Sequence, residues 1–557
     1  MKHIRLAWAV SILLAPCGAQ AAPAPSALAP AAPAPTLVDA AGACNALRSP
    51  ENGARFVLIP DAPASINSAR IVPAGGSHGA ADDDLPEICR VEGVIAPTVG
   101  FLLRMPTTNW NGKFMMGGCG GPCGNYLEDR IDPALVRHYA VVNTDMGHKG
   151  GGWLFGYNNL QGQVDFAYRA THLTAVVAKE LIKTFYGSAA SRNYFNGCST
   201  GGRQAMIEAQ RFPHDFEGII AGAPVYDEVG DTPYFLEWNI LVNTAKDGST
   251  ILAEDKLEVV HQAVLQKCDA LDGLADGLLM NPARCEFDPR TLVCKAGQSG
   301  AQCLTPAQAE VVQKFHDGAR NSKGDKLYFG MPWGSEDQWK GFGWISPTGR
   351  QRDTTGASIT GFLGFESGAP KGPEYSIRDF DYDAHPQRLD LTGVIHNPVN
   401  PDLSRFRTAG GKLILFTGWH DNNIPPEATV DYYEAAIRAN GGEAATQQFF
   451  RLFLPPAVNH CRSGDGGGEI DWITALENWV EKGVAPELVL AHRPVAPYVT
   501  APRALEDYGA PYLKLGRHPY PVGTFDRARP VYPYPSWTRY SGKGDPADPK
   551  SWVKVAR

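Results

Sequence analysis

The sequence has no apolar run beyond its first residues that is long enough to cross a bilayer, which argues against a membrane-spanning protein or a membrane partner. It also has no concentrated basic segment: the net charge is −8 over 557 residues, which argues against nucleic acid as a partner. No internal repeat is present, and only residues 22–40 are of low complexity. The remaining composition, 43% hydrophobic and 20% charged, is that of a globular protein long enough for more than one core.

The amino terminus is typical of an export signal. Basic residues precede a short apolar run at residues 6–14, and Ala19-Gln20-Ala21 offers a small-x-small cleavage site. We therefore expect a signal peptide at residues 1–21, an Ala/Pro-rich tether at 22–40, and a secreted or periplasmic protein. Leu14-Ala15-Pro16-Cys17 offers lipidation as an alternative, although a proline beside the cysteine fits a lipoprotein box poorly.

The cysteines agree with export. Of the eleven in the sequence, Cys17 leaves with the expected signal peptide and ten remain. An even number is what a disulfide framework in an oxidising compartment requires. The alternative is that some are buried as small apolar residues. The sequence by itself leaves the pairing open.

Strand and helix patterns alternate between about residues 95 and 225. Apolar runs predict strands, and apolar residues at three- and four-residue steps predict helices. The expected strands are 101–105, 114–116, 139–144, one ending at Tyr194-Phe195, and 218–222, and the expected helices are 164–186 and 203–212. This rhythm predicts the α/β class, with a mostly parallel sheet covered by helices.

The alternation of strand and helix patterns stops at about residue 227 and resumes with strands at 412–416 and 449–454. The intervening residues are rich in Gly, Pro, Trp and Cys. We therefore expect one core built from residues 41–226 and 401–557, with residues 227–400 inserted as a lid domain. An insertion above the carboxyl ends of the strands would cover a ligand site.

A candidate nucleophile lies in Gly197-Cys198-Ser199-Thr200-Gly201, which matches G-x-S-x-G. Gly75-Gly76-Ser77-His78-Gly79 matches as well, so the string alone decides little. A nucleophile elbow must follow a strand and open a helix, because its turn is too tight for side chains at the flanks. Only Ser199 has that context. The alternative is a structural serine in a glycine-rich turn.

A serine nucleophile needs a base and an acid that orients it, and in this arrangement they follow in the order Ser, acid, His. Asp421 lies just past the strand at 412–416, and His460 follows the strand at 449–454. His420 is a rival base, but it precedes Asp421 and would have no acid upstream. The alternative for His460 is an ordinary loop histidine.

Two cysteines flank these candidates: Cys198 precedes Ser199, and Cys461 follows His460. If Ser199 and His460 touch, the two sulfurs are forced close together. Gly-Cys-Ser-x-Gly-Gly with a distant His-Cys resembles the tannase and feruloyl esterase family. Further segments with this resemblance are Phe195-Asn196-Gly197-Cys198-Ser199-Thr200-Gly201-Gly202-Arg203, Gln210-Arg211-Phe212-Pro213, Gly218-Ile219-Ile220-Ala221-Gly222-Ala223-Pro224 and Tyr532-Pro533-Tyr534-Pro535.

The resemblance covers nearly the whole mature chain. It implies an α/β-hydrolase core with a large inserted lid domain, and a triad of Ser199, Asp421 and His460. It also implies a Cys198–Cys461 disulfide. Three further pairings rest on the resemblance alone: Cys44–Cys89, Cys268–Cys285 and Cys294–Cys303.

An oxyanion hole needs two backbone N–H donors. Thr200, the residue after the nucleophile, should supply one. The second should come from the glycine-rich loop at residues 117–124, where the family alignment places Gly121, with Gly120 as the fallback. A flexible turn is the alternative for this loop. Its Cys119 and Cys123 depart from the family pattern and could close a small disulfide ring or bind a metal.

Cys268-Asp269-Ala270-Leu271-Asp272-Gly273-Leu274-Ala275-Asp276-Gly277-Leu278 places three carboxylates at steps of three and four with glycine turns. Such oxygen ligands suit a hard cation, although the loop is not an EF-hand. It resembles the calcium loop of the family. The resemblance implies structural calcium held by Asp269, Asp272 and Asp276 and by the carbonyls of Leu274 and Leu278. The alternative is a solvated acidic turn.

These features together predict a secreted serine carboxylic ester hydrolase that uses two-step acyl transfer and no organic cofactor. The resemblance implies esters of aromatic acids as substrates: hydroxycinnamic or gallic esters, free or attached to plant polymer, or a terephthalate half-ester. In the half-ester hydrolase a lid arginine holds the free carboxylate. The alignment puts Ser358 there, with Arg350 and Arg352 out of register, so we favour a feruloyl esterase or tannase.

Aromatic side chains in the lid could stack on the substrate ring, or they could form the core of the lid. They are Trp333, Trp339, Phe342, Trp344, Phe362 and Phe365. Two other functions stay open. One is a peptidase or polyester-oligomer hydrolase on the same scaffold. The other is a non-catalytic polyphenol- or carbohydrate-binding protein with a relict hydrolase fold.

Overall fold

The computed structural model describes residues 37–75, 85–298, 300–340, 344–346, 349, 359–364, 372–494 and 525–557. The expected signal peptide, Cys17, Ser77 and most of the tether lie outside these residues. So do Phe342, Arg350, Arg352, Ser358 and Phe365. Among the helices in the described ranges, none is both long and apolar enough to span a membrane.

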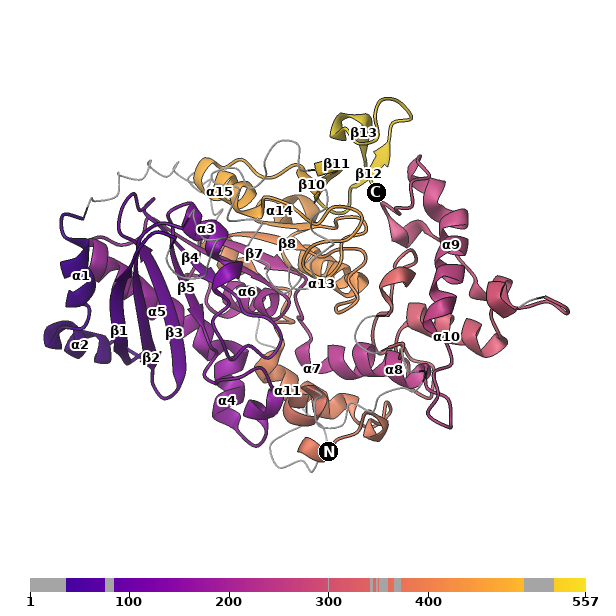
Figure 1. Cartoon of the computed structure of the whole chain (residues 1–557), viewed down its shortest axis with the longest axis horizontal. Helices are drawn as coiled ribbons and strands as arrows, with labels where there is room; N and C mark the ends of the chain where they lie inside the picture. The colour runs from indigo at the N-terminus through magenta and orange to yellow at the C-terminus, as the bar shows by residue number, and fades with distance from the viewer. Residues whose placement is uncertain are drawn as a thin grey trace, which may run out of the picture. The chain divides into compact units, whose positions relative to one another are not determined.

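A nine-stranded sheet organises the chain, in the order β1-β2-β3-β5-β4-β6-β7-β8-β9 (Figure 1). The first three strands and β5 pair antiparallel, and the strands from β5 to β9 pair parallel. The strands are β1 (Ala64–Val72), β2 (Ile88–Ile95), β3 (Val99–Pro106), β4 (Lys113–Gly117), β5 (Ala140–Thr144), β6 (Arg192–Cys198), β7 (Gly218–Gly222), β8 (Lys412–Phe416) and β9 (Phe450–Phe453). The α/β class predicted from the sequence is confirmed.

Helices cover both faces of the parallel part, which is why its strands are continuous apolar runs. Met116 and Phe195 pack on one face with α5 (Ala170–Tyr186), α6 (Thr200–Arg211) and α13 (Pro426–Ala439). Met115 and Tyr194 pack on the other with α3 (Asp132–Val136) and α15 (Trp472–Lys482). The predicted helix at 164–186 is α4 (Leu160–Val164), a π-helical turn and α5. The helix predicted at 203–212 begins three residues earlier, directly after Ser199.

The residues between β7 and β8 form helices and loops with a hydrophobic cluster of their own. They include the helices α7 (Glu228–Asp231), α8 (Trp238–Val242), α9 (Leu257–Cys268), α10 (Pro306–Asp317) and α11 (Pro386–His396). Trp339 and Trp344 are fully buried and pack edge-on against Phe315 of α10. Trp333 and Phe362 are buried as well. Trp333, Trp339 and Trp344 belong to the hydrophobic cluster of this segment, which supports the core alternative for these three rings.

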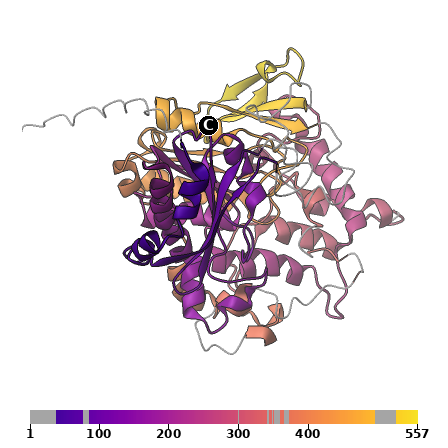
Figure 2. The same ribbon diagram turned by 60° about the vertical axis from the view of Figure 1, so that its left-hand side comes forward.

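The remaining elements of the described residues are four short helices and two pairs of strands. The other helices are α1 (Ala40–Ala46), α2 (Pro50–Val57), α12 (Ser404–Thr408) and α14 (Glu443–Thr446). Two antiparallel pairs follow β9, coloured gold to yellow in Figure 2: β10 (Val489–Pro494) with β11 (Phe525–Val531), and β12 (Trp537–Tyr540) with β13 (Trp552–Val555). A bridge between Phe453 and Pro533 ties this end of the chain to the edge strand β9.

Candidate active site

Ser199 lies in the tight turn between β6 and α6, with φ 65° and ψ −124°. A side chain disfavours positive φ, so this backbone must be held by its surroundings. Its amide donates to the Gly222 carbonyl of β7 at 3.0 Å. A Cβ on Gly197 would lie 2.5 Å from the Gly201 carbonyl oxygen, which shows why the flanking positions are glycine. This strand–turn–helix geometry is the one predicted for an elbow.

Asp421 and His460 meet at the carboxyl ends of β8 and β9. The Asp421 carboxylate is fully buried and accepts the amides of Asn423 and Ile424 at 2.9 and 3.0 Å. Both of its oxygens also lie 2.9–3.0 Å from Nδ1 of His460. An Nδ1–H donated to this carboxylate leaves Nε2 of His460 unprotonated and able to accept a proton.

His420, the rival base, lies elsewhere. Its Nδ1 is 3.9 Å from Asp337, and burial lowers the pKa of its imidazole. Asp421 therefore pairs with His460, as the Ser-acid-His order predicted.

The Cys198–Cys461 disulfide joins the nucleophile turn to the histidine loop. It connects residues 263 positions apart, with Cα atoms separated by 5.8 Å. Because Cys198 precedes Ser199 and Cys461 follows His460, the bond fixes both loops to each other. A cavity of about 250 Å³ adjoins this disulfide and is lined in part by His460, Gly118 and Phe416.

The glycine-rich loop after β4 packs against the start of α6. A Cβ on Gly118 would lie 2.6 Å from Cα of Gly201, so the two backbones touch. The Thr200 hydroxyl donates to the Gly121 carbonyl at 2.8 Å. Among the described residues, the amides of Gly121 and Thr200 have no hydrogen-bond acceptor. In the described part of the chain both candidate oxyanion donors therefore keep a free N–H, and the Thr200 hydroxyl joins the two residues.

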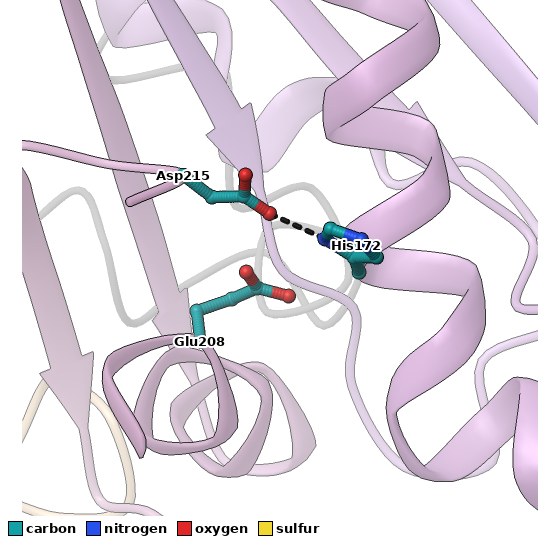
Figure 3. A group of neighbouring side chains, drawn as sticks. All are labelled: His172, Glu208 and Asp215. Carbon is teal, nitrogen blue, oxygen red and sulfur yellow. Dashed lines mark hydrogen bonds and ion pairs between the residues drawn. The ribbon is translucent and has the colours of Figure 1, made fainter. Parts of the chain in front are cut away.

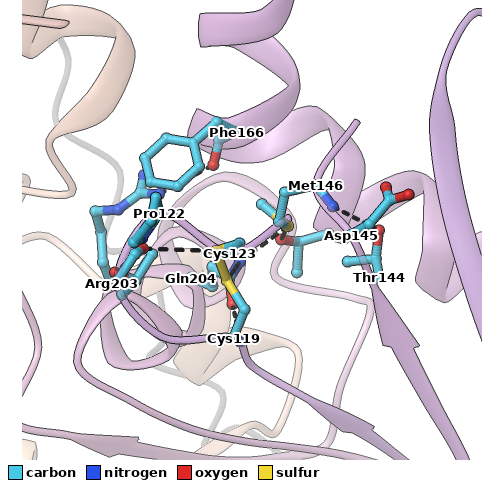
Figure 4. Close-up of a disulfide and its surroundings, with 12 residues drawn as sticks. Cys119, Pro122, Cys123, Thr144, Asp145, Met146, Phe166, Arg203 and Gln204 are labelled. Carbon is cyan, nitrogen blue, oxygen red and sulfur yellow. Dashed lines mark hydrogen bonds between the residues drawn. A yellow bond between two sulfur atoms is a disulfide. The ribbon is translucent and has the colours of Figure 1, made fainter. Parts of the chain in front are cut away.

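All ten cysteines of the described chain form disulfides. The three pairings implied by the resemblance, Cys44–Cys89, Cys268–Cys285 and Cys294–Cys303, are present. The fifth bond joins Cys119 to Cys123 within the glycine-rich loop (Figure 4). The alternatives left open for these two cysteines are thus decided in favour of a small ring.

The acidic loop after α9 has carboxylate oxygens suited to a cation. Asp269 Oδ1 and Asp276 Oδ1 are buried without a hydrogen-bond partner. Asp272 accepts the amides of Leu274 and Met280 at 3.1 Å, and burial raises the pKa of its carboxyl to about 7. The other Asp276 oxygen pairs with Arg529 at 2.6 Å. The unpartnered oxygens fit a bound calcium ion, which would take two further ligands from the carbonyls of Leu274 and Leu278.

A second cluster of possible metal ligands was not found from the sequence. His172, Glu208 and Asp215 each place one ligand atom within 4.8 Å of the others (Figure 3). His172 Nδ1 lies 2.6 Å from Asp215, and the Lys179 ammonium lies 3.4 Å from the same carboxylate. Burial raises the pKa of Glu208 well above its usual value, which disfavours its charged form beside Asp215. Because His172 and Lys179 already pair with Asp215, we assign no metal here.

Comparison with known proteins identifies the family to which the chain belongs. Residues 85–555 match the family model described as "Tannase and feruloyl esterase". An uncharacterized esterase of Xanthomonas campestris pv. campestris is 32% identical, with 88% of this chain and 89% of the relative covered. Mono(2-hydroxyethyl) terephthalate hydrolase of Piscinibacter sakaiensis is 31% identical, with 90% of each chain covered.

A solved structure supports the same assignment. The crystal structure of feruloyl esterase B from Aspergillus oryzae has a TM-score of 0.76 at 26% identity, covering 93% of this chain and 100% of that one. The resemblance to this family, first seen at the nucleophile motif, thus holds for most of the sequence and for the fold. The chain belongs to the tannase and feruloyl esterase family, and it is a carboxylic ester hydrolase of that type.

Proposed function

We propose that Ser199, Asp421 and His460 hydrolyse esters of aromatic acids, with hydroxycinnamic and gallic esters as the substrate class. The observation that carries this proposal is the elbow at Ser199 tied through Cys198–Cys461 to a histidine that donates to a buried aspartate. The names of the relatives support the substrate class, since they include a feruloyl esterase and an aromatic half-ester hydrolase.

The reaction proceeds by two acyl transfers. His460 Nε2 takes the hydroxyl proton of Ser199 as its oxygen attacks the ester carbonyl, and then gives that proton to the departing alcohol. Water, deprotonated by the same nitrogen, attacks the acyl-enzyme and releases the acid and Ser199. Asp421 keeps the proton on Nδ1 and stabilises the imidazolium that forms in both steps.

The charge on the carbonyl oxygen is stabilised by the free N–H groups of Gly121 and Thr200. The Thr200 hydroxyl supports this arrangement, because its bond to the Gly121 carbonyl holds the loop against α6. Loss of one such donor costs roughly a hundred- to a thousandfold in kcat. If Gly120 were the donor instead, the carbonyl held by Thr200 would lie one peptide further from the donor N–H.

Calcium is proposed as a structural ion of the acidic loop, held by Asp269, Asp272, Asp276 and the carbonyls of Leu274 and Leu278. The loop is stapled by Cys268–Cys285, and Asp276 contacts Arg529 near the carboxy terminus. The ion would therefore connect parts of the chain rather than take part in acyl transfer. We also propose that the protein is secreted or periplasmic, which the five disulfides support.

The test is hydrolysis of methyl ferulate, methyl gallate and mono(2-hydroxyethyl) terephthalate by the purified protein, with Ser199→Ala as the control. We expect turnover of a ferulate or gallate ester that Ser199→Ala abolishes. Preference for the terephthalate half-ester would correct the substrate class. Cleavage of anilides without esters would indicate a peptidase, and binding without turnover would indicate a non-catalytic protein.

A further inference from the structure

We propose that the Cys119–Cys123 disulfide positions the Gly121 N–H for catalysis and so acts on turnover as well as on stability. The inference rests on the proposed function, in which Gly121 is an oxyanion donor. The two cysteines enclose only Gly120, Gly121 and Pro122, and their Cα atoms are 5.4 Å apart. The expected donor therefore lies inside the smallest disulfide ring of the described chain.

The backbone of this ring needs a constraint. Gly121 has φ 56°, Cys123 has φ 65° and Gly124 has φ 81°, all in the left-handed region. Glycines adopt such angles freely but also adopt many others, and a cysteine adopts them only when it is held. Without a cross-link, this segment would sample many orientations of the Gly121 peptide.

The ring is anchored on the helix that begins at the nucleophile (Figure 4). The Cys119 amide donates to Gln204 Oε1 at 3.1 Å, and Gln204 Nε2 lies 3.1 Å from the Cys119 sulfur. Since the disulfide ties Cys123 to Cys119, it extends this anchor to the far side of the ring. Thr200 and His148 hold the carbonyls of Gly121 and Pro122 at 2.8 and 2.7 Å.

Both sulfur-bearing residues are buried, with 4% of Cys119 and 3% of Cys123 exposed. The bond is therefore part of the packed wall behind the oxyanion loop, in contact with α6, and not a solvent-exposed staple. Its removal would leave space beside the Gly120–Gly121 peptide, in which the N–H could turn away from the carbonyl oxygen of the substrate.

An oxyanion donor stabilises the transition state more than the bound ester. A loosened donor should therefore lower kcat while KM stays nearly constant. Because removal of a donor costs roughly a hundred- to a thousandfold, a donor that is present but poorly oriented should cost about tenfold. A bond that merely stabilises the fold would leave kcat of the folded protein unchanged.

The experiment compares the wild type, Cys119→Ala/Cys123→Ala and the control Cys294→Ala/Cys303→Ala. The control removes another short disulfide, which joins residues nine positions apart in the segment between β7 and β8. Methyl ferulate or methyl gallate kinetics are measured at a temperature where all three proteins are folded, together with hydrogen exchange of residues 117–124. We expect a kcat about tenfold lower, KM within threefold, and faster exchange, in the first variant only.

Three results would overturn the proposal. These are an unchanged kcat in Cys119→Ala/Cys123→Ala, an equal loss in both variants that follows their melting temperatures, or free thiols at Cys119 and Cys123 in the unreduced wild type. Failure of the proposed function is recognised separately, because the wild type then hydrolyses none of the esters. In that case exchange at 117–124 still decides whether the disulfide orders the loop, and unchanged exchange rejects it.

Discussion

Removal of the Cys198–Cys461 disulfide is expected to be the most destabilising single cross-link deletion in this protein. A disulfide stabilises mainly by restricting the unfolded chain, and the effect grows with the logarithm of the loop it closes. For a separation of 263 residues the chain-entropy relation gives about 5.6 kcal/mol, against about 2.6 kcal/mol for the nine-residue separation of Cys294–Cys303. The two deletions should thus differ by about 3 kcal/mol.

The assay is urea unfolding of Cys198→Ala/Cys461→Ala and Cys294→Ala/Cys303→Ala, followed by tryptophan fluorescence and compared with the wild type. The first variant should unfold at a clearly lower urea concentration than the second. It should also lose turnover while still folded, since His460 is then positioned only by its own loop and by Asp421. Equal midpoints, or a lower midpoint for the lid variant, would refute the argument from loop length. Full activity would show that the disulfide does not position the histidine.

Three other changes test separate parts of the site. Asp421→Asn should lower kcat about ten-thousandfold with little change in KM, because an amide cannot keep the proton on Nδ1 of His460. A variant with full activity would show that Asp421 is not the acid of the triad. Chelation of calcium by EDTA should lower the melting temperature of the wild type, and added calcium should restore it. The melting temperature of Asp269→Asn should not change with EDTA. If EDTA leaves the melting temperature of the wild type unchanged, the protein does not hold the proposed calcium ion. Glu208 has a raised folded-state pKa, so its contribution to stability is complete below about pH 4.5 and is lost as pH rises through that pKa. Glu208→Gln, which stays neutral, should therefore flatten the decline of the urea midpoint as pH rises above about 4.5. An unchanged decline would mean that Glu208 is ionised throughout.

The parallel half of the fold and the triad candidates could be predicted from the sequence because their signals are local. Strands β5 and β7 are buried on both faces and therefore read as unbroken apolar runs. The elbow has a short motif in a strand–turn–helix context. Asp421 and His460 follow strands whose carboxyl ends must meet at one edge of the sheet.

Strand β1 gave no comparable signal. In β1 most residues are partly or fully exposed, and only Ala64, Ala69 and Val72 are buried, so neither an apolar run nor a clean alternation is present. The strand is identified by its pairing with β2, which a sequence pattern does not contain. The role of the aromatic side chains in the lid could not be decided from the sequence either. An aromatic residue that stacks on a ligand and one that fills a core give the same sequence pattern.

The least predictable feature is the polar face of α6. Thr200, Gln204 and Glu208 are spaced four residues apart and therefore share one side of the helix. All three are almost completely buried, where an amphipathic pattern would place apolar side chains.

Their partners explain the choice. Thr200 holds the Gly121 carbonyl, Gln204 holds the Cys119 amide, and Glu208 faces Asp215 and His172 of α5. An apolar side chain at each position would bury as much surface but would not fix the direction of a backbone N–H. The helix that begins at the nucleophile thus orients the oxyanion loop through hydrogen bonds from Thr200 and Gln204 on one face. A pattern of hydrophobicity alone does not reveal such a role.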